Sequence, residues 1–144
     1  VSEGFYDGLG INNILAVDFH GNVNCAARDR NHLSGIGGAA MIHRGLTRGG
    51  VAYLCLKSTH RTPEGERRSS IFPYLPRGTP VGQIGPDLMG GREGARVMLV
   101  TEHGIVQVSG LTQWDFIKAV ISVADPAFRP WLRREAWKEF RVSA

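Results

Sequence analysis

The sequence predicts an α/β fold in which helices flank an open, mixed and mostly parallel sheet. A continuous apolar run at residues 51–56 and a second, mostly apolar segment at residues 96–101 have the length and composition of strands that are buried on both faces. An amphipathic segment at residues 113–124 and an aromatic-containing segment at residues 127–140 are predicted as helices. Because buried strands alternate with helices along the chain, a mainly parallel sheet is expected.

A hairpin and a glycine-rich connection precede the first buried strand. Residues 13–19 are predicted as a strand, and residues 22–26 return after a short glycine-containing turn. The glycine-rich segment 34–38 then leads into a predicted helix at residues 39–48, where apolar side chains recur at roughly helical spacing. A pair of glycines ends this helix before the strand begins.

The middle of the chain is predicted to be mostly loop. Residues 58–69 are polar and of mixed charge, which is typical of an exposed loop. A short strand is expected at residues 70–72, ended by Pro73, and a weak one at residues 79–84. The glycine-rich residues 85–94 are expected to form a mobile insertion.

The C-terminal elements carry clearer boundary signals. Gly104 interrupts the second buried strand, and residues 105–108 are predicted to resume as a strand. Thr112 and Asp115 resemble a capping box that starts the first of the two helices. Asp125 and the proline after it are expected to end that helix.

Length and composition narrow the class of protein. A chain of 144 residues, 42% hydrophobic, has room for a single domain, residues 1–144, with one sizeable core. No run approaches the roughly eighteen apolar residues of a membrane-spanning helix. The chain begins at Val1 without a signal-peptide pattern, so we expect a cytoplasmic protein and part of a longer chain.

The net charge of +4 comes mainly from arginine. A net positive charge is compatible with nucleic acid, a membrane surface or an anionic small molecule as a partner. The arginines are scattered, which favours ordinary surface solvation over a nucleic-acid site. Cys25 and Cys55 have no partner spacing, so buried reduced thiols are expected rather than a disulfide. The histidines lack metal-ligand spacing, and no metal is expected.

Two segments are candidates for chemistry. Gly35, Gly37 and Gly38 precede a predicted helix N-terminus, where free backbone N–H groups favour an anion, although glycines can also serve a tight connection. Glu102 follows a buried strand at the edge where open α/β sheets bind ligands. It would act as a base, orient a ligand or be an ordinary polar strand end. Adjacent residues on a strand point to opposite faces, which argues against direct cooperation with His103.

Six sequence motifs occur in an order that resembles a known family. They are Ile11-Asn12 with Val17-Asp18 and Gly21-Asn22-Val23, Ser34-Gly35-Ile36-Gly37-Gly38, Arg44-Gly45 with Gly49-Gly50, Ser70-Ile71-Phe72-Pro73, Val100-Thr101-Glu102-His103-Gly104, and Ala124-Asp125-Pro126-Ala127-Phe128-Arg129. In this order they resemble the C-terminal part of the acetyl-CoA hydrolase/transferase family, which includes 4-hydroxybutyrate, succinyl-CoA:acetate and butyryl-CoA:acetate CoA-transferases. The resemblance implies the NagB/RpiA-like sheet of CoA-transferases, with coenzyme A as a substrate.

The resemblance also implies a mechanism. In such enzymes a glutamate carboxylate attacks an acyl-CoA thioester, the CoA thiolate opens the acyl-glutamyl anhydride, and CoA passes from the glutamyl thioester to a second carboxylate. By resemblance, Gly37 and Gly38 supply oxyanion N–H groups and Asn12 is an active-site asparagine. Glu102 matches a second active-site glutamate that is not the nucleophile.

The nucleophile has a candidate near the start of the chain. In the family it lies in a Ser-Glu-x-x-x-Asp-Gly-like segment well upstream of the asparagine motif. Residues 2–8 have this spacing but lie only a few residues before Asn12, so Glu3 is a candidate. A chance likeness and a nucleophile outside this chain are the alternatives. Ala39 and Met41, which replace usual family residues beside the glycines, leave the substrate open.

Three functions are therefore considered. The first is the C-terminal domain of a CoA-transferase or acyl-CoA hydrolase, with an acyl-CoA and a carboxylate acceptor as partners. The second is a non-catalytic CoA-binding partner or regulatory module, and the third is a basic nucleic-acid-binding domain. The first is preferred, without nucleic acid or membrane as a partner, and with homo-oligomerisation or association with a CoA-transferase N-terminal half.

Overall fold

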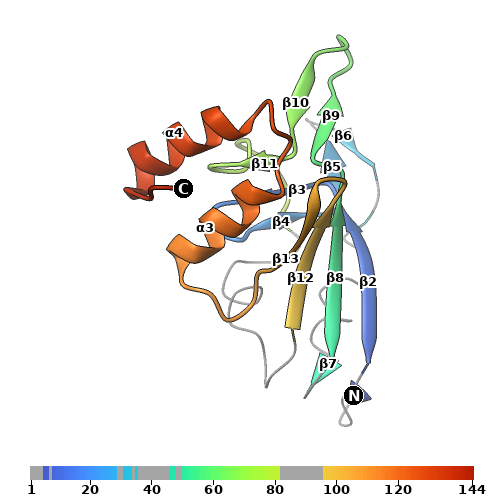
Figure 1. The fold of residues 1–144 in the computed structure, drawn as a ribbon. Helices are drawn as coiled ribbons and strands as arrows, with labels where there is room; N and C mark the ends of the chain where they lie inside the picture. Colours follow the sequence, from blue (N-terminus) through green and yellow to red (C-terminus); the bar gives the residue numbers. More distant parts are fainter. Residues whose placement is uncertain are drawn as a thin grey trace.

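The computed structural model describes residues 5–6, 8–28, 31–33, 35, 46–47, 50–81 and 96–144. Its main sheet has four strands in the order β13-β12-β8-β2. Strands β2 (Leu9–Ile14), β8 (Val51–Leu56) and β12 (Arg96–Thr101) are parallel, and β13 (Gly104–Gln107) is antiparallel to β12 (Figure 1). The predicted α/β class with a mixed, mostly parallel sheet is confirmed.

The main sheet is covered by helices on one face in the described part of the chain (Figure 1). Along β8, Ala52, Leu54 and Leu56 are buried, whereas Tyr53 and Cys55 are only half-buried. Strand β12 alternates in the same way. The prediction that both strands are buried on two faces is therefore wrong. A run of apolar residues does not distinguish a covered face from one that is left partly open.

A second sheet of three strands lies beside the main one, in the order β11-β3-β4. Strands β3 (Ala16–Asp18) and β4 (Val23–Asn24) form the predicted hairpin, and β11 (Ile71–Phe72) joins β3 in parallel. The predicted strand 13–19 is divided because the chain bends at Leu15 and passes from one sheet to the other.

The hairpin turn is fixed by Asp18. Its Oδ1 accepts hydrogen bonds from the backbone N–H groups of His20, at 3.0 Å, and Asn22, at 2.9 Å. Gly21 follows with a φ of 77°, a conformation that residues with a Cβ rarely adopt. A buried aspartate and a glycine at these positions therefore determine the turn.

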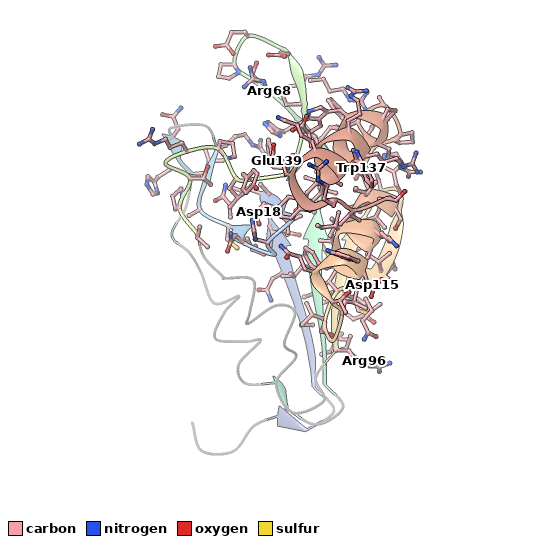
Figure 2. All side chains as sticks on the ribbon, turned by 90° about the vertical axis from the view of Figure 1, so that its left-hand side faces the viewer. Asp18, Arg68, Arg96, Asp115, Trp137 and Glu139 are labelled. Atoms are coloured by element: carbon pink, nitrogen blue, oxygen red, sulfur yellow. The ribbon has the colours of Figure 1, made fainter. Side chains whose placement is uncertain are left out.

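A short hairpin replaces part of the loop predicted for residues 58–69. Strands β9 (Thr59–Arg61) and β10 (Arg67–Ser69) pair antiparallel and extend beyond the main sheet (Figure 1). The prediction missed them because both strands are polar and give no alternating hydrophobic pattern. Figure 2 shows Arg68 on this hairpin, with its side chain at the surface.

Other predictions fall at the edges of the described residues. Strand β7 (Leu46–Thr47) pairs in parallel with β1 (Phe5–Tyr6), so the end of the predicted helix 39–48 is wrong, and residues 39–45 lie outside the described part. Two more short strands, β5 (Ala27–Arg28) and β6 (Asn31–His32), form a hairpin. Residues 79–81 are not in a strand; residues 82–95, which include the expected insertion, lie outside the described part.

Helix α3 (Gln113–Ser122) begins as predicted. The hydroxyl of Thr112 accepts a hydrogen bond from the backbone N–H of Asp115 at 3.2 Å and donates one to its carboxylate at 2.7 Å. Helix α4 (Arg129–Phe140) starts two residues later than predicted, because the Asp125 carboxylate accepts from the N–H of Ala127 at 2.9 Å and holds a turn there.

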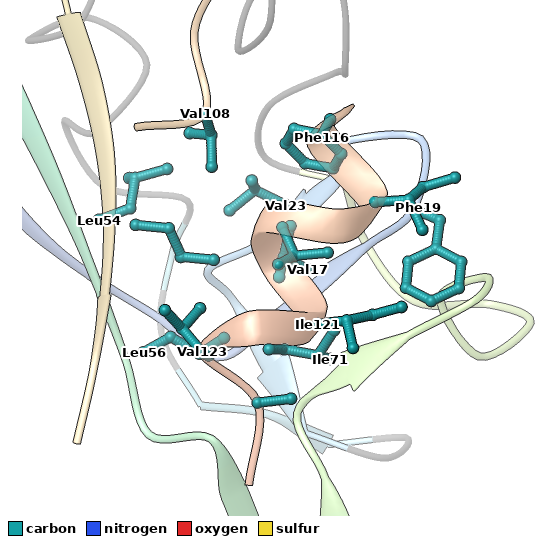
Figure 3. Packing of buried hydrophobic residues seen from close by; sticks show 14 of the residues in the cluster. Val17, Phe19, Val23, Leu54, Leu56, Ile71, Val108, Phe116, Ile121 and Val123 are labelled. Carbon is teal, nitrogen blue, oxygen red and sulfur yellow. The ribbon is translucent and has the colours of Figure 1, made fainter. Parts of the chain in front are cut away.

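The hydrophobic core lies between the two sheets and is organised around α3 (Figure 3). Phe116, Ile117 and Val120 are fully buried on this helix. They belong to one cluster that also contains Leu54 and Val17, from the main and the second sheet respectively. None of the helices in the described part of the chain is long and apolar enough to cross a membrane.

Candidate functional site

A hollow of about 470 Å³ lies at the carboxyl ends of the parallel strands. This is the edge at which open α/β sheets bind ligands. The described residues that line it are Asn13, Ile14, Leu15, Arg28, Cys55, Leu56, Lys57, Val100, Thr101 and Glu102. Asn13 and Val100 both pair with Cys55 on the strand between them, so the three side chains point to the same face of the sheet. This is the face that α3 does not cover, and the hollow opens on it.

Glu102 is held in this hollow by a single residue of the neighbouring strand end. Its Oε1 accepts a hydrogen bond from the Ser58 hydroxyl at 2.6 Å, and its Oε2 accepts one from the Ser58 backbone N–H at 2.9 Å. Partial burial raises the pKa of Glu102, but these two hydrogen bonds outweigh it and the net pKa is lowered. Glu102 is therefore an ionised, oriented carboxylate whose side chain is still 45% exposed.

His103 lies against the same carboxylate. Its Nε2 is 3.9 Å from Oε1 of Glu102 and 3.5 Å from Oδ2 of Asp125, which is buried and forms an ion pair with Arg67. The argument that neighbouring residues point to opposite faces does not apply here, because residues 102–103 form the turn between β12 and β13. The backbone N–H of His103 bonds to Thr101 Oγ1 at 3.0 Å and fixes this turn.

Asn12 and Glu102 are not brought together in the hollow. Asn12 is in register with the buried Leu54, so it lies on the sheet face that α3 covers. Its Nδ2 is enclosed and has no hydrogen-bond partner among the described residues. The next residue, Asn13, lies on the opposite face and lines the hollow with Glu102. An active-site role for Asn12 stays a prediction.

The glycine segment and the candidate nucleophile lie almost wholly outside the described part of the chain. Gly37, Gly38 and Glu3 are not described, so their proposed roles remain predictions. Gly35 is exposed, and a Cβ at this position would meet no heavy atom within 4 Å. Its described surroundings therefore give no steric reason for a glycine.

Sequence reasoning missed Ser58 and Arg28. Ser58 comes two residues after the apolar strand 51–56, so the rule that singled out Glu102 at a strand end would also have found it. Arg28 gave no such signal, because it reaches the hollow only through the fold of the short β5–β6 hairpin. Cys25 and Cys55 are thiols, as predicted, although both are half-buried.

Known proteins match this chain along most of its length. A butyryl-CoA:acetate CoA-transferase from Anaerostipes caccae is 33% identical over 132 residues, which are 90% of this chain and 28% of that protein. A 4-hydroxybutyrate coenzyme A transferase from Clostridium kluyveri is 31% identical over 134 residues, which are 92% of this chain and 29% of that protein. The chain thus spans less than a third of these relatives.

Solved structures agree with the predicted fold type. The crystal structure of RipA from Yersinia pestis superposes with a TM-score of 0.70 and 27% identity, covering 90% of this chain and 27% of that one. A 4-hydroxybutyrate CoA-transferase from Porphyromonas gingivalis shares the fold, with a TM-score of 0.58 over 92% of this chain and 27% of its own. The CoA-transferase type of α/β sheet is confirmed.

The family comparison covers the residues that build both sheets and the hollow. The model described as the acetyl-CoA hydrolase/transferase C-terminal domain matches residues 6–136, so this chain belongs to that family.

Proposed function

We propose that the chain is one domain, residues 1–144, of a CoA-transferase or acyl-CoA hydrolase, and that its hollow receives the thioester end of an acyl-CoA. The observation that carries this proposal is the ionised Glu102 carboxylate, oriented by Ser58 at the carboxyl edge of a parallel sheet. Coenzyme A is a substrate here, and a carboxylic acid accepts the CoA. Membership of the family and the CoA-transferase relatives support this assignment.

In this proposal Glu102 orients substrate and is not the nucleophile. Both of its oxygens already accept hydrogen bonds from Ser58, which lowers the carboxylate's basicity. Another glutamate, Glu3 or one outside this chain, attacks the thioester carbon. CoA thiolate leaves and then attacks the resulting anhydride, releasing the acid and forming a glutamyl-CoA thioester. Gly37 and Gly38 donate backbone N–H groups to the oxyanions, and Asn12, which lies on the other face of β2 from the hollow, supports the acyl site from behind that strand.

The proposed partner is the remainder of a CoA-transferase, with self-association as a further possibility for the complete protein. The relatives are more than three times as long as their matched segment, which supports a larger assembly. Leu9, Ile11 and Ile105 are exposed on the face of the main sheet that holds the hollow. Apolar surface of this kind is typical of interaction sites. We also propose a cytoplasmic location, where thiols such as Cys55 stay reduced.

The test uses protein expressed from the complete reading frame that encodes this chain. Incubation with acyl-CoA followed by borohydride or hydroxylamine is expected to modify one glutamate, which peptide mapping identifies. Calorimetric CoA binding without such modification would instead indicate a non-catalytic CoA-binding module. Absence of CoA binding would refute both CoA functions.

Glu102→Gln separates the orienting role from the nucleophilic one. The variant is expected to lower kcat/KM by about 10²-fold, as when one group that stabilises a transition state is removed, while the trapped glutamate is still labelled. Glu64→Gln, in the exposed β9–β10 turn, is the matched control and should keep full activity. Mapping the label to Glu102 itself would contradict the orienting role.

A further inference from the structure

Arg28 is an unusual basic residue in this structure. It is half-buried at the end of β5, yet its guanidinium forms no hydrogen bond or ion pair with the described residues. Arginines elsewhere in the fold have partners: Arg67 pairs with Asp125, and Arg129 Nε donates to the Ala124 carbonyl at 2.9 Å. Among the lysines and arginines of the described part of the chain, Arg28 alone is half-buried and unpaired.

The backbone that carries Arg28 is rigidly held. The buried Asn24 side chain accepts from the N–H groups of Ala26, at 3.0 Å, and Ala27, at 3.1 Å, and donates to the Ala27 carbonyl at 2.6 Å. The Ala26 carbonyl also accepts from the N–H of Leu33 at 2.8 Å. The position of Arg28 is therefore determined by the fold and does not depend on a contact of its own guanidinium.

Arg28 stands where two hollows meet. It lines the Glu102 hollow and also a smaller one, of about 60 Å³, that His60 and Arg68 border on the side of the β9–β10 hairpin. Lys57 adds a further positive charge to the larger hollow. Among the described residues, the lining of the larger hollow contains one carboxylate, Glu102, and the lining of the smaller one contains none. The region around Arg28, where the two hollows meet, is therefore positively charged.

A half-buried guanidinium without an anion carries a desolvation cost that proteins usually offset by pairing. Glu102 does not offset it, because its oxygens bind Ser58 and it is not in ion-pair contact with Arg28. The planar fork of an arginine matches carboxylate and phosphate oxygens in bidentate geometry. An anion from outside the protein would complete the site.

We propose that Arg28 binds an anionic group of the substrate that is separate from the carbonyl reacting beside Glu102. This inference rests on the proposed function. The group is a carboxylate or a phosphate, and it has two possible sources. One is the distal carboxylate of a dicarboxylic acyl group, and the other is a phosphate of CoA. In either case Arg28 contributes to substrate affinity and selectivity and takes no part in bond breaking.

The test compares ligands with and without each anion, by calorimetry on protein from the complete reading frame. Wild type, Arg28→Gln and the matched control Arg134→Gln, an exposed α4 arginine, are titrated with succinyl-CoA, butyryl-CoA, CoA and pantetheine. Arg28→Gln is expected to weaken binding at least tenfold, and the control should bind like wild type. A loss confined to succinyl-CoA identifies the distal carboxylate. An equal loss for all three CoA compounds, with pantetheine unaffected, identifies a phosphate.

Two further measurements make the result decisive. Arg28→Gln should leave Tm unchanged or slightly higher, because it removes an unpaired charge, and Arg28→Lys should restore part of the affinity. Wild-type-like binding of every ligand by Arg28→Gln would overturn the inference. If wild type binds no CoA compound but binds succinate or inorganic phosphate through Arg28, the proposed function fails and the anion site stands. If wild type binds none of these probes, both are refuted.

Discussion

The Ser58 hydroxyl helps to lower the pKa of Glu102. Ser58→Ala removes the 2.6 Å donor and keeps the backbone N–H, so the pKa of Glu102 should rise toward its ordinary value of 4.5. A hydrogen bond to a charged group contributes about 1.5–3 kcal/mol when buried, and the 45% exposure of Glu102 reduces this to about 1 kcal/mol. We expect urea unfolding to show this loss at neutral pH.

The sign of the pH dependence follows from the lowered pKa. A carboxyl whose folded pKa lies below its unfolded value stabilises the fold above the unfolded value and loses that contribution as pH falls through the folded one. The difference in unfolding free energy between wild type and Ser58→Ala should therefore be full above about pH 5 and shrink below it. Ser122→Ala, which loses only a bond to Ala119, is the control. A difference that grows on acidification would contradict the assignment.

Glu102 could be predicted as a site residue because it directly follows an apolar strand, where the sheet rule applies without knowledge of the tertiary fold. Arg28 could not. Its approach to the hollow depends on the Asn24 turn and on a two-residue strand without hydrophobic alternation. The error about His103 has a local cause: a strand was assumed to continue through residues that form a turn.

At the scale of elements, Asp125 joins the two helices to the site. One of its oxygens holds the turn before α4 through Ala127, and the other faces Arg67 and His103. Asp125→Asn keeps the turn bond but loses the ion pair, which should cost about 1–2 kcal/mol because Arg67 is 49% exposed. Asp125→Ala loses both and should cost about 3 kcal/mol. Chemical denaturation measures both values, and equal effects would argue against the separate turn bond.

The start of α3 offers a simpler prediction. Thr112→Ala removes the side chain that caps the helix through Asp115, and a lost N-cap costs about 1 kcal/mol. Lys118→Ala, on the exposed side of the same helix, serves as the control for helix composition. An unfolding free energy equal for wild type and Thr112→Ala would show that the cap does not contribute.

The boundaries of α3 and α4 were close to prediction because caps, a proline and amphipathic spacing are local signals. The β9–β10 hairpin was not predicted, because its strands are polar and lack hydrophobic alternation. Gly65, at a φ of 87°, lies in the turn between them. The bend at Leu15 was also missed. A single apolar run, Ile14 to Val17, supplies strands to two sheets, and only tertiary packing separates them.

At the scale of the whole molecule, the core and the hollow occupy different faces of one sheet. The face toward α3 is closed by large apolar side chains, and the other carries exposed Ile11 and Ile105 beside the hollow. The residues that stabilise the fold and the residues that would contact a ligand therefore lie on opposite faces of the main sheet. Substitutions on the core face should change folding without moving the Glu102 carboxylate, whereas changes at the hollow should affect binding more than stability.

Phe116 tests this separation because α3 links both sheets through it. The side chain is fully buried, 0% exposed, within the cluster that contains Leu54 and Val17. Phe116→Ala should cost about 3–5 kcal/mol, since it removes transfer free energy and leaves a cavity that two sheets cannot easily close. Trp114→Ala, on the same helix but 60% exposed, should change stability by no more than about 0.5 kcal/mol. If denaturation gave similar values for both, α3 would not join the two sheets into one cooperative core.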